Sequence, residues 1–260
     1  MIEISKKITT NVGRTNAQFG LIKENDRIMI GFSGGKDSLT LLHTLNRMQK
    51  KAPFKFDFKA VTITYGMGEQ IEFLSNHCKE HGIEHEIIDT QIFDLAGEKI
   101  RKNSSFCSFF SRMRRGYLYT TALEQGYNKI ALGHHLDDAM ESYFMNLFYN
   151  GTMRTMPPIY KANNGLEVIR PLIFCRERQL RAFADSNEIR VIGDEACPGL
   201  RFDVKMPHAR ATTKELLAKL EEQNPKIFVS MKAAFSNIQL PTFFYNNLKD
   251  IKLNIEDENI

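Results

Sequence analysis

Short apolar runs alternate with amphipathic stretches along most of the chain. Apolar and β-branched residues typical of buried strands lie at 27–32, 58–65, 84–89, 129–133 and 189–192. Apolar residues at helical spacing lie at 2–23, 39–45, 69–81, 112–125, 137–149, 176–187, 208–223 and 225–238. Strands that alternate with helices indicate βαβ units. The pattern therefore predicts an α/β fold, a doubly wound parallel sheet with a leading N-terminal helix and C-terminal helices.

The length of 260 residues fits one large domain with short extensions. We predict an N-terminal helix in 1–24, one nucleotide-binding α/β domain over 25–240 and a C-terminal tail over 241–260. The sequence shows no internal repeat and no low-complexity tract.

The composition, 42% hydrophobic and 25% charged, is typical of a soluble globular protein and excludes a disordered chain, a collagen and a coiled coil. Every long apolar run is interrupted within a few residues, so no membrane span is expected. Residues 1–14 lack the apolar core of a secretion signal. We expect a cytoplasmic protein.

The net charge of +4 is a mild bias that is compatible with a nucleic-acid partner. Arginines concentrate in two stretches, one over 101–115 and the other over 170–181. Single charges usually lie on solvated helix faces, but two arginine-rich stretches beside a candidate active site favour phosphate-backbone contact.

The four cysteines are Cys78, Cys107, Cys175 and Cys197. No two of them have CxxC spacing, so neither a zinc ribbon nor a thioredoxin-like motif is present. In a cytosolic chain they are expected to be thiols, either buried or reactive. Cys78 lies on an amphipathic helix and is expected to be a small buried hydrophobe.

A glycine-rich loop follows the first predicted strand and opens a helix. Its residues are Ser33, Gly34, Gly35, Lys36, Asp37 and Ser38. Glycines let backbone amides approach an anion closely, and the helix N-terminus and the lysine add positive charge. The loop departs from the Walker A pattern, because Ile30 stands where that pattern has its first glycine. The context predicts a phosphate-binding loop rather than a plain glycine turn.

A second polar cluster, Gly-His-His-Leu-Asp-Asp over 133–138, follows a predicted strand. Its side chains should project at the ligand edge of the sheet. Gly133 and His134 are candidate nucleotide contacts, although paired histidines are more often structural. Asp137 and Asp138 are candidates for proton transfer, and Asp37 and Asp138 for holding Mg²⁺.

The loop resembles that of the pyrophosphatase-loop (PP-loop) ATPases, which cleave ATP between the α and β phosphates. Four further segments match one family in order and spacing: Ser111–Gly116, Ala131–Asp138, Met156–Pro158, and Val168–Leu172 running into Cys175–Glu177. Together they resemble the tRNA-cytidine 2-sulfurtransferases over roughly residues 20–240.

The resemblance implies an ATP-dependent tRNA sulfurtransferase that adenylates a cytidine C2 carbonyl and replaces the oxygen with sulfur. The implied cofactors are ATP and Mg²⁺, and the implied partners are tRNA and a sulfur-donor protein, a cysteine desulfurase or a carrier. Arg114 would face the reaction centre. The expected tRNA contacts are Arg112, Arg115, Arg170 and Arg176. A homodimer is also predicted, without residue-level support.

The match departs from the family at the sulfur site. The family carries two cysteine pairs, three of whose thiolates hold a [4Fe–4S] cluster. Here Phe110 and Asp194 replace one cysteine of each pair, and Cys107 and Cys197 remain. Two thiolates hold such a cluster poorly. We therefore favour a relay, with a persulfide on one cysteine and a disulfide with the other after transfer; a labile cluster and a pair of relic thiols remain as alternatives.

Two other functions stay open. An adenylating enzyme of the same superfamily would act on another tRNA base or use another nucleophile, as lysidine synthetases use lysine. An ATP- or tRNA-binding homologue without sulfur transfer would explain the missing cluster ligands, although the intact loop and both aspartates argue against it. Beside Cys107, the aromatic residues Phe106, Phe109 and Phe110 are expected to pack in the core, and stacking on a flipped base is the alternative.

Overall fold

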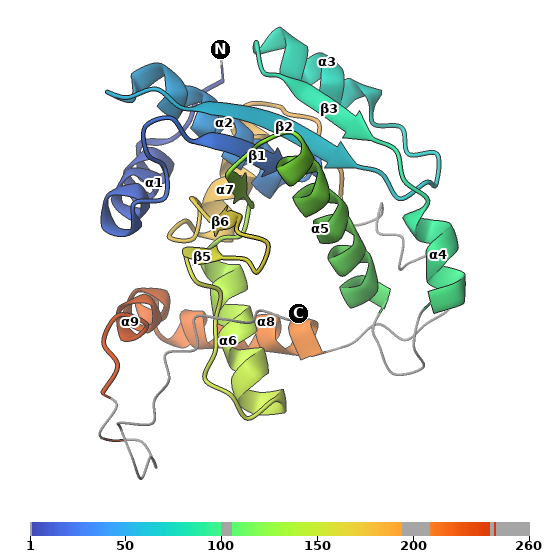
Figure 1. The fold of residues 1–260 in the computed structure, drawn as a ribbon. Coiled ribbons are helices and arrows are strands. Elements are labelled where there is room, and N and C mark those ends of the chain that lie inside the picture. The colour runs from blue at the N-terminus through green and yellow to red at the C-terminus, as the bar shows by residue number, and fades with distance from the viewer. Residues whose placement is uncertain (1, 100–105, 194–208, 240–241, 243–260) are drawn as a thin grey trace.

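A computed structural model describes residues 2–99, 106–193, 209–239 and 242 (Figure 1). The six strands are β1 (Arg27–Gly31), β2 (Asp57–Ile63), β3 (His85–Ile88), β4 (Lys129–Ala131), β5 (Ile159–Lys161) and β6 (Glu167–Ile169). The helices are α1 (Lys6–Phe19), α2 (Lys36–Lys51), α3 (Glu72–Glu80), α4 (Ile92–Lys99), α5 (Phe106–Glu124), α6 (Leu136–Tyr149), α7 (Glu177–Ser186), α8 (Ala209–Gln223) and α9 (Ile227–Ala234).

The strands form one sheet in the order β3-β2-β1-β4-β6-β5. Every neighbouring pair is parallel except β5–β6, which is antiparallel. The order changes direction at β1, so the carboxyl ends of β1 and β4 flank the point where an open α/β sheet usually binds its ligand. The predicted α/β fold is confirmed, with one antiparallel edge strand added.

Both faces of the sheet are buried, as the continuous apolar composition of its central strand requires. On β1, Ile28 and Ile30 point into a core shared with α1, α2, α3 and α7. Met29, between them, points into the opposite core, which includes α4 and α5. Figure 1 shows the corresponding layers, with α5 on one side of the central strands and α1, α2 and α7 on the other.

The leading helix α1 is part of the main core. Ile8 and Val12 are fully or almost fully buried and pack in the same cluster as the first half of α2. Ser5 caps the helix by accepting a hydrogen bond from the Ile8 amide, and Gly20 ends it in the left-handed conformation.

The C-terminal helices pack against the first half of α6, which α8 crosses (Figure 1). Leu136 and Met140 of α6 pack with Leu217 of α8 and Phe228 of α9 in a third apolar cluster. This contact brings the polar side of α8 to the edge of the sheet where β4 ends. None of the helices in the described part of the chain has the length and apolar character that crossing a membrane requires.

Three predictions about elements were wrong or incomplete. Residues 189–192 form no strand; the Ile192 amide instead donates to the Gly34 carbonyl, so this segment covers the loop after β1. The sequence pattern missed α4 and the two three-residue strands β5 and β6. Helix α5 begins at Phe106 rather than near residue 112, which places Arg114 and Arg115 inside the helix and not at its start. The predicted tail over 241–260 lies outside the described residues except at 242.

Candidate active site

The loop after β1 presents the open N-terminus of α2. Gly35 is the N-cap and offers no side chain, so no cap hydrogen bond forms. In the part of the chain that the structure describes, no protein acceptor takes the amides of Lys36, Asp37 and Ser38. Unpaired amides together with the helix dipole form a binding site for an anion such as phosphate. The loop is braced from within, because Ser33 Oγ lies 3.2 Å from Ser38 Oγ and the Ser38 hydroxyl donates to the Gly35 carbonyl.

Two glycines are required by close approach. Gly34 has φ +78°, and a Cβ there would lie 2.7 Å from Ile192 Cδ1. A Cβ at Gly133 would lie 3.1 Å from the Asp37 carbonyl carbon and 3.2 Å from the Ser38 amide nitrogen. The absence of a side chain at Gly133 therefore lets the loop after β4 touch the first turn of α2.

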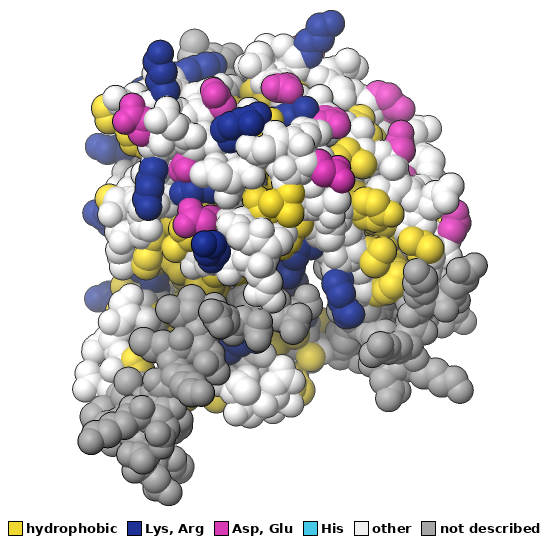
Figure 2. All heavy atoms as spheres, in the orientation of Figure 1, with side chains coloured by type: hydrophobic (Ala, Val, Ile, Leu, Met, Phe, Trp, Pro, Cys, Tyr) yellow, Lys and Arg dark blue, Asp and Glu magenta, His cyan; other side chains and the backbone are white. Residues whose placement is uncertain are grey.

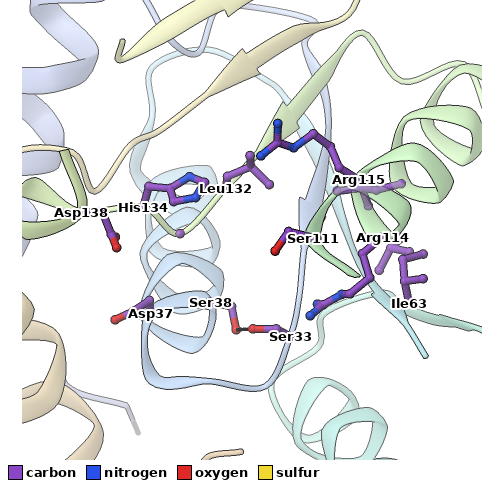
Figure 3. Close-up of a pocket in the computed structure, with 14 residues that line it drawn as sticks. Ser33, Asp37, Ser38, Ile63, Ser111, Arg114, Arg115, Leu132, His134 and Asp138 are labelled. Atoms are coloured by element: carbon purple, nitrogen blue, oxygen red, sulfur yellow. Dashed lines mark hydrogen bonds between the residues drawn. The ribbon is translucent and has the colours of Figure 1, made fainter. Parts of the chain in front are cut away.

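A cavity of about 310 Å³ lies where these two loops meet. Figure 3 shows its lining, in which Asp37 and Asp138 lie on one side and Ser111, Arg114 and Arg115 of α5 on the other. A wider cavity of about 850 Å³ adjoins it and shares Ser33, Asp37, Ile63 and Arg114. The pair of cavities runs along the carboxyl edge of the sheet, from the β4 loop past the phosphate loop to residues 65–73.

Asp37 carries a carboxylate oxygen without a hydrogen bond at this junction. Its Oδ1 is buried and accepts no hydrogen bond among the described residues, although Lys36 Nζ lies 3.4 Å from it as an ion-pair partner. Burial raises the pKa of Asp37, while the charges of His135 and Lys36 act in the opposite direction. A buried oxygen that accepts no hydrogen bond, with the Asp138 carboxylate beside it (Figure 3), suits a divalent cation that brings phosphate oxygens with it. Asp37 and Asp138 are thus the residues that would hold Mg²⁺.

Asp138 is held by a capping box at the start of α6. The His135 amide donates to Asp138 Oδ2 at 3.0 Å, and the Asp138 amide donates to His135 Nδ1 at 3.4 Å. Arg210 of α8 binds the other carboxylate oxygen at 2.5 Å. Burial raises the pKa of Asp138, but the charges of His135, His134 and Arg210 outweigh that effect and lower it. Asp138 is therefore an anion that faces the cavity.

His134 lines the same cavity and is kept neutral. Arg170 donates to its Nδ1 at 3.3 Å, and Arg170 itself is buried, with a second bond to the Pro157 carbonyl. Burial, followed by the charge of Arg170, lowers the pKa of His134 to about 4. A neutral imidazole accepts at Nδ1, which leaves its Nε2–H as a donor.

Asp137 points away from this cavity. It accepts from Arg176 Nε at 3.1 Å and from the Glu177 amide at 2.8 Å, so it caps the N-terminus of α7. Arg176 also forms a two-pronged ion pair with Glu221 of α8, at 2.7 and 2.8 Å, and lies over the Phe228 ring. The structure thus brings Asp137 to Arg176 and not to the other predicted catalytic groups.

Lys36 of the phosphate loop is paired across the site. Its Nζ lies 3.2 Å from Glu177, which also binds Lys214 of α8 at 2.8 Å. Burial raises the pKa of Glu177, but the hydrogen bond from Lys214 and the charge of Lys36 prevail and lower it to about 2. Glu177 is therefore a permanent anion that orients Lys36 when no phosphate is present.

The arginines of α5 differ in their surroundings. Arg114 donates to the Tyr65 hydroxyl at 2.7 Å and lies over that ring, at the boundary of the two cavities. Arg115 lines the smaller cavity, and Arg112 is exposed. On the face that Figure 2 shows, basic and acidic side chains interleave.

Comparison with known proteins agrees with this geometry. A PP-loop domain model matches residues 4–205. The tRNA-cytidine(32) 2-sulfurtransferase of Geobacter metallireducens is 44% identical over 237 residues, covering 90% of each chain. That of Pseudomonas syringae is 37% identical and covers 95% of this chain and 89% of its own. The chain belongs to the tRNA-cytidine(32) 2-sulfurtransferase family. The resemblance seen in the sequence is confirmed.

The fold of this sulfurtransferase-family chain also matches solved structures. The U34-tRNA thiolase of Methanococcus maripaludis, a structure with its [4Fe–4S] cluster, superposes with a TM-score of 0.73 at 24% identity, covering 89% of this chain and 78% of that one. The NAD synthetase of Campylobacter jejuni superposes with a TM-score of 0.51 at 16% identity, covering 91% and 93%. At these identities the likeness shows a shared PP-loop fold.

The cysteines separate into two groups in this family member. Cys78 and Cys175 are fully buried, and burial raises the pKa of each thiol to about 12. The prediction that Cys78 is a buried hydrophobe is confirmed. Cys107 lies in the first turn of α5, but its side chain lies outside the described residues, as does all of Cys197.

The position where family members carry another cysteine is filled by the core. Phe110 is 2% exposed and packs edge-on against Tyr65 and Phe109. The prediction that Phe109 and Phe110 belong to the core is confirmed, and the side chain of Phe106 lies outside the described residues. Asp194, the other replacement, also lies outside them. The described residues therefore offer no third thiolate beside the cavity.

Sequence reasoning missed several residues of the site. His135 caps α6, Tyr65 holds Arg114, and Arg210 and Lys214 hold Asp138 and Glu177. A His three residues before an Asp is a recognisable capping box, so His135 could have been found. Arg210 lies 72 residues after Asp138, and Lys214 lies 37 residues after Glu177. No local pattern signals contacts over such separations.

Proposed function

We propose that this chain thiolates cytidine 32 of tRNA in an ATP-dependent reaction. The observation that carries the proposal is the open first turn of α2, whose unpaired amides lie beside an oxygen of Asp37 that accepts no hydrogen bond. Such a turn suits an anion such as the phosphates of a nucleotide. The family membership supplies the nucleoside, since the related enzymes are named for that position.

The ATP half of the reaction follows from the loop. The α2 amides and Lys36 bind phosphate oxygens, and Lys36 exchanges Glu177 for them. The cytidine O2 attacks the α phosphorus and pyrophosphate leaves, which turns O2 into part of an AMP leaving group. A divalent cation on Asp37 and Asp138 would neutralise phosphate charge. Arg114, at the boundary of the two cavities, stabilises the pentavalent phosphorus, and His134 offers an N–H donor at the same edge.

The sulfur half is assigned to Cys107 and Cys197, as the sequence suggests. The terminal sulfur of a persulfide on Cys107 attacks C2 and AMP departs, which leaves a mixed disulfide between the base and the enzyme. The Cys197 thiolate then attacks the Cys107 sulfur, so the C2 sulfur leaves as thiocytidine and a Cys107–Cys197 disulfide remains. A thiol reductant and a new sulfane sulfur, supplied by a cysteine desulfurase or a carrier protein, restore the enzyme.

Among the predicted tRNA contacts, exposure supports Arg112 and Arg115 more than the other two. Arg112 is exposed and Arg115 lines the cavity, whereas Arg170 is 3% exposed and the Arg176 side chain 13% exposed. Arg170 and Arg176 serve this proposal as positioning groups for His134 and for the α7 N-terminus. The predicted homodimer and the cytoplasmic location stay predictions.

The test is mass spectrometry of nucleosides from tRNA of a deletion strain that is complemented with the unaltered gene, with Cys107→Ser or with Cys78→Ala. We expect 2-thiocytidine with the unaltered gene and with Cys78→Ala, and none with Cys107→Ser. The purified Cys107→Ser protein should still convert ATP to AMP in the presence of tRNA. Thiocytidine formed by Cys107→Ser would contradict the relay.

Other outcomes would favour the competing functions. AMP formation that depends on tRNA, without any thiolated nucleoside, would favour an adenylating enzyme that uses a different nucleophile. Absence of AMP formation together with tight ATP binding would favour a binding protein without sulfur transfer. Iron in stoichiometric amount in the anaerobically purified protein would favour a [4Fe–4S] cluster over the persulfide relay.

A further inference from the structure

Three histidines converge on one point away from the carboxyl edge of the sheet. His43 lies on α2, His77 lies on α3, and His81 is the C-cap of α3. One ring nitrogen from each histidine can be chosen so that all three lie within 4.8 Å of one another. The sequence pattern already contains two of the three residues, because His77 and His81 are four residues apart and therefore share one helix face.

The rings are arranged around a common centre rather than stacked. Their centroids are separated by 4.9 Å between His43 and His77, 4.8 Å between His43 and His81, and 4.7 Å between His77 and His81. The interplanar angles, 90°, 83° and 66°, are all far from parallel. Three imidazoles that bind one ion adopt such mutually tilted orientations, since each must aim a nitrogen lone pair inward.

We propose that His43, His77 and His81 form a binding site for a divalent transition metal such as Zn²⁺. Imidazole nitrogen is a preferred ligand of this ion, and three histidines plus one water make a common tetrahedral set. The proposal is independent of the function proposed above.

The spacing is close to what coordination needs. His43 Nε2 and His77 Nε2 are 2.7 Å apart, a hydrogen-bonding distance. Two nitrogens on one tetrahedral ion, each about 2.0–2.1 Å from it, lie about 3.3–3.4 Å apart. A side-chain movement of well under 1 Å opens the pair to admit the ion, which then replaces the shared proton.

The surroundings of His43 keep its ring in the neutral, metal-binding form. His43 is 4% exposed, and burial, followed by the charges of His77 and His81, lowers its pKa to about 3. His77 and His81 are half-buried, so the group is open to solvent on one side. That opening provides an entry path and room for the water that completes the coordination.

The site would strengthen the contact between two helices whose apolar residues already share the main core. The Asn46 side chain donates to the His81 carbonyl at 3.4 Å, and His43 packs beside Phe183 of α7. Because α2 carries the phosphate loop at its N-terminus, an ion bound by the three histidines fastens the middle of that helix to α3.

The experiment titrates the purified full-length protein with Zn²⁺ in competition with a chromophoric chelator. A Cys107→Ser, Cys197→Ser background removes the thiols that are candidates for reactive sulfur. The variants are His77→Gln and His81→Gln, and the matched control is His85→Gln, a histidine on β3 that instead bonds to Thr62 and Ser75. We expect one Zn²⁺ per chain in the background and in the control.

Loss of one of three ligands should weaken binding by more than the roughly 10–100-fold that loss of an outer-shell partner produces. At a Zn²⁺ concentration about 100 times Kd, the melting temperature of the Cys107→Ser, Cys197→Ser protein should be about 5–10 °C higher than without Zn²⁺. The His81→Gln variant should show no such shift. Equal affinity and equal thermal shifts in the background and in both cluster variants would overturn the site and leave adventitious binding only.

A second measurement does not depend on how well the variants fold. Co²⁺ replaces Zn²⁺ in tetrahedral sites and reports its ligands by absorption. Co²⁺ added to the protein with all four cysteines present should give visible ligand-field bands without the near-ultraviolet charge-transfer bands of cobalt–thiolate bonds. Charge-transfer bands at one equivalent of Co²⁺, or no ligand-field bands at all, would overturn the proposal.

Discussion

Two helix N-termini meet at the carboxyl edge of the sheet, and they differ in how they are capped. At α2 the N-cap is a glycine, and the first amides have no acceptor within the described residues. At α6 the N-cap is His135, whose ring and backbone exchange hydrogen bonds with Asp138, and the Leu136 amide donates to the Cys175 carbonyl. The first terminus is ready for an external anion, whereas the second has internal acceptors for the Leu136 and Asp138 amides and contributes a carboxylate.

This difference divides the chemistry of the site. A helix end without internal acceptors gains stability from an anionic ligand, because dipole and amides both favour negative charge. A capped end gains nothing from such a ligand, but it fixes its carboxylate in one direction. The site therefore joins a half whose open amides suit an anion and an acidic half, and Gly133 is the point where the two halves touch.

The largest effect is expected from Lys36→Met, which removes the only charged side chain that the α2 terminus itself offers to phosphate. Loss of one such group typically lowers kcat about 10²–10³-fold. The measurement is AMP formation from ATP in the presence of tRNA. Lys51→Met, at the exposed opposite end of the same helix, is the control and should leave the rate within about twofold of the unaltered protein. A loss of less than about tenfold for Lys36→Met would contradict the assignment of this terminus to phosphate.

Gly34→Ala should lower the free energy of unfolding by about 2–4 kcal/mol, since it adds both positive-φ strain and overpacking. The added Cβ would lie 2.7 Å from Ile192 Cδ1. Gly82→Ala is the matched control, because Gly82 has φ +67° but no neighbour within 4 Å. Urea unfolding of both variants separates the two contributions, and equal losses would show that Ile192 does not cover the loop as described.

The ion pairs of Glu177 predict a pH dependence of stability. Its pKa is about 2 in the folded protein against 4.5 ordinarily, so the folded state favours the anion. The resulting stabilisation, about 3 kcal/mol before solvent screening of the partly exposed ion pairs reduces it, is fully present above pH 4.5 and is lost as the pH falls towards 2. The unaltered protein should therefore exceed Glu177→Gln in unfolding free energy at pH 7, and this excess should shrink between pH 4.5 and 2. An excess that stays constant over that range would contradict the pairing with Lys36 and Lys214.

The smallest expected effect comes from a comparison of substitutions at the two neighbouring aspartates, Asp137 and Asp138. Asp137→Asn should lower stability by about 1–2 kcal/mol, because Arg176 and the Glu177 amide lose a charged acceptor. Asp138→Asn should act mainly on the rate of AMP formation, and the Mg²⁺ concentration that gives half of the maximal rate should rise. Rates for both variants are compared per folded molecule, using circular dichroism to measure that fraction. A larger loss of rate for Asp137→Asn would support the catalytic role that the sequence predicted for Asp137.

The sequence was sufficient for the α/β fold, the phosphate loop and the family. Those predictions depend on local features: apolar periodicity, a glycine-rich turn between strand and helix, and motifs in a fixed order. It was misleading where the signal was short or ambiguous. Residues 189–192 are apolar enough for a strand, but they pair with the loop at Gly34 instead.

Only the tertiary structure decided which partner each charged side chain contacts. Asp137 and Asp138 are equivalent as sequence, yet one caps α7 and the other faces the cavity, because successive residues of a helix point about 100° apart. Arg170 and Arg176 look like surface cations in the sequence, but the folded chain buries both side chains against partners. His43 of α2 lies at least 34 residues before the two histidines of α3, and only the packing of those helices brings the three together. A motif made of neighbouring residues can be recognised in the sequence. The partners of a charged side chain depend on which distant element the folded chain places beside it.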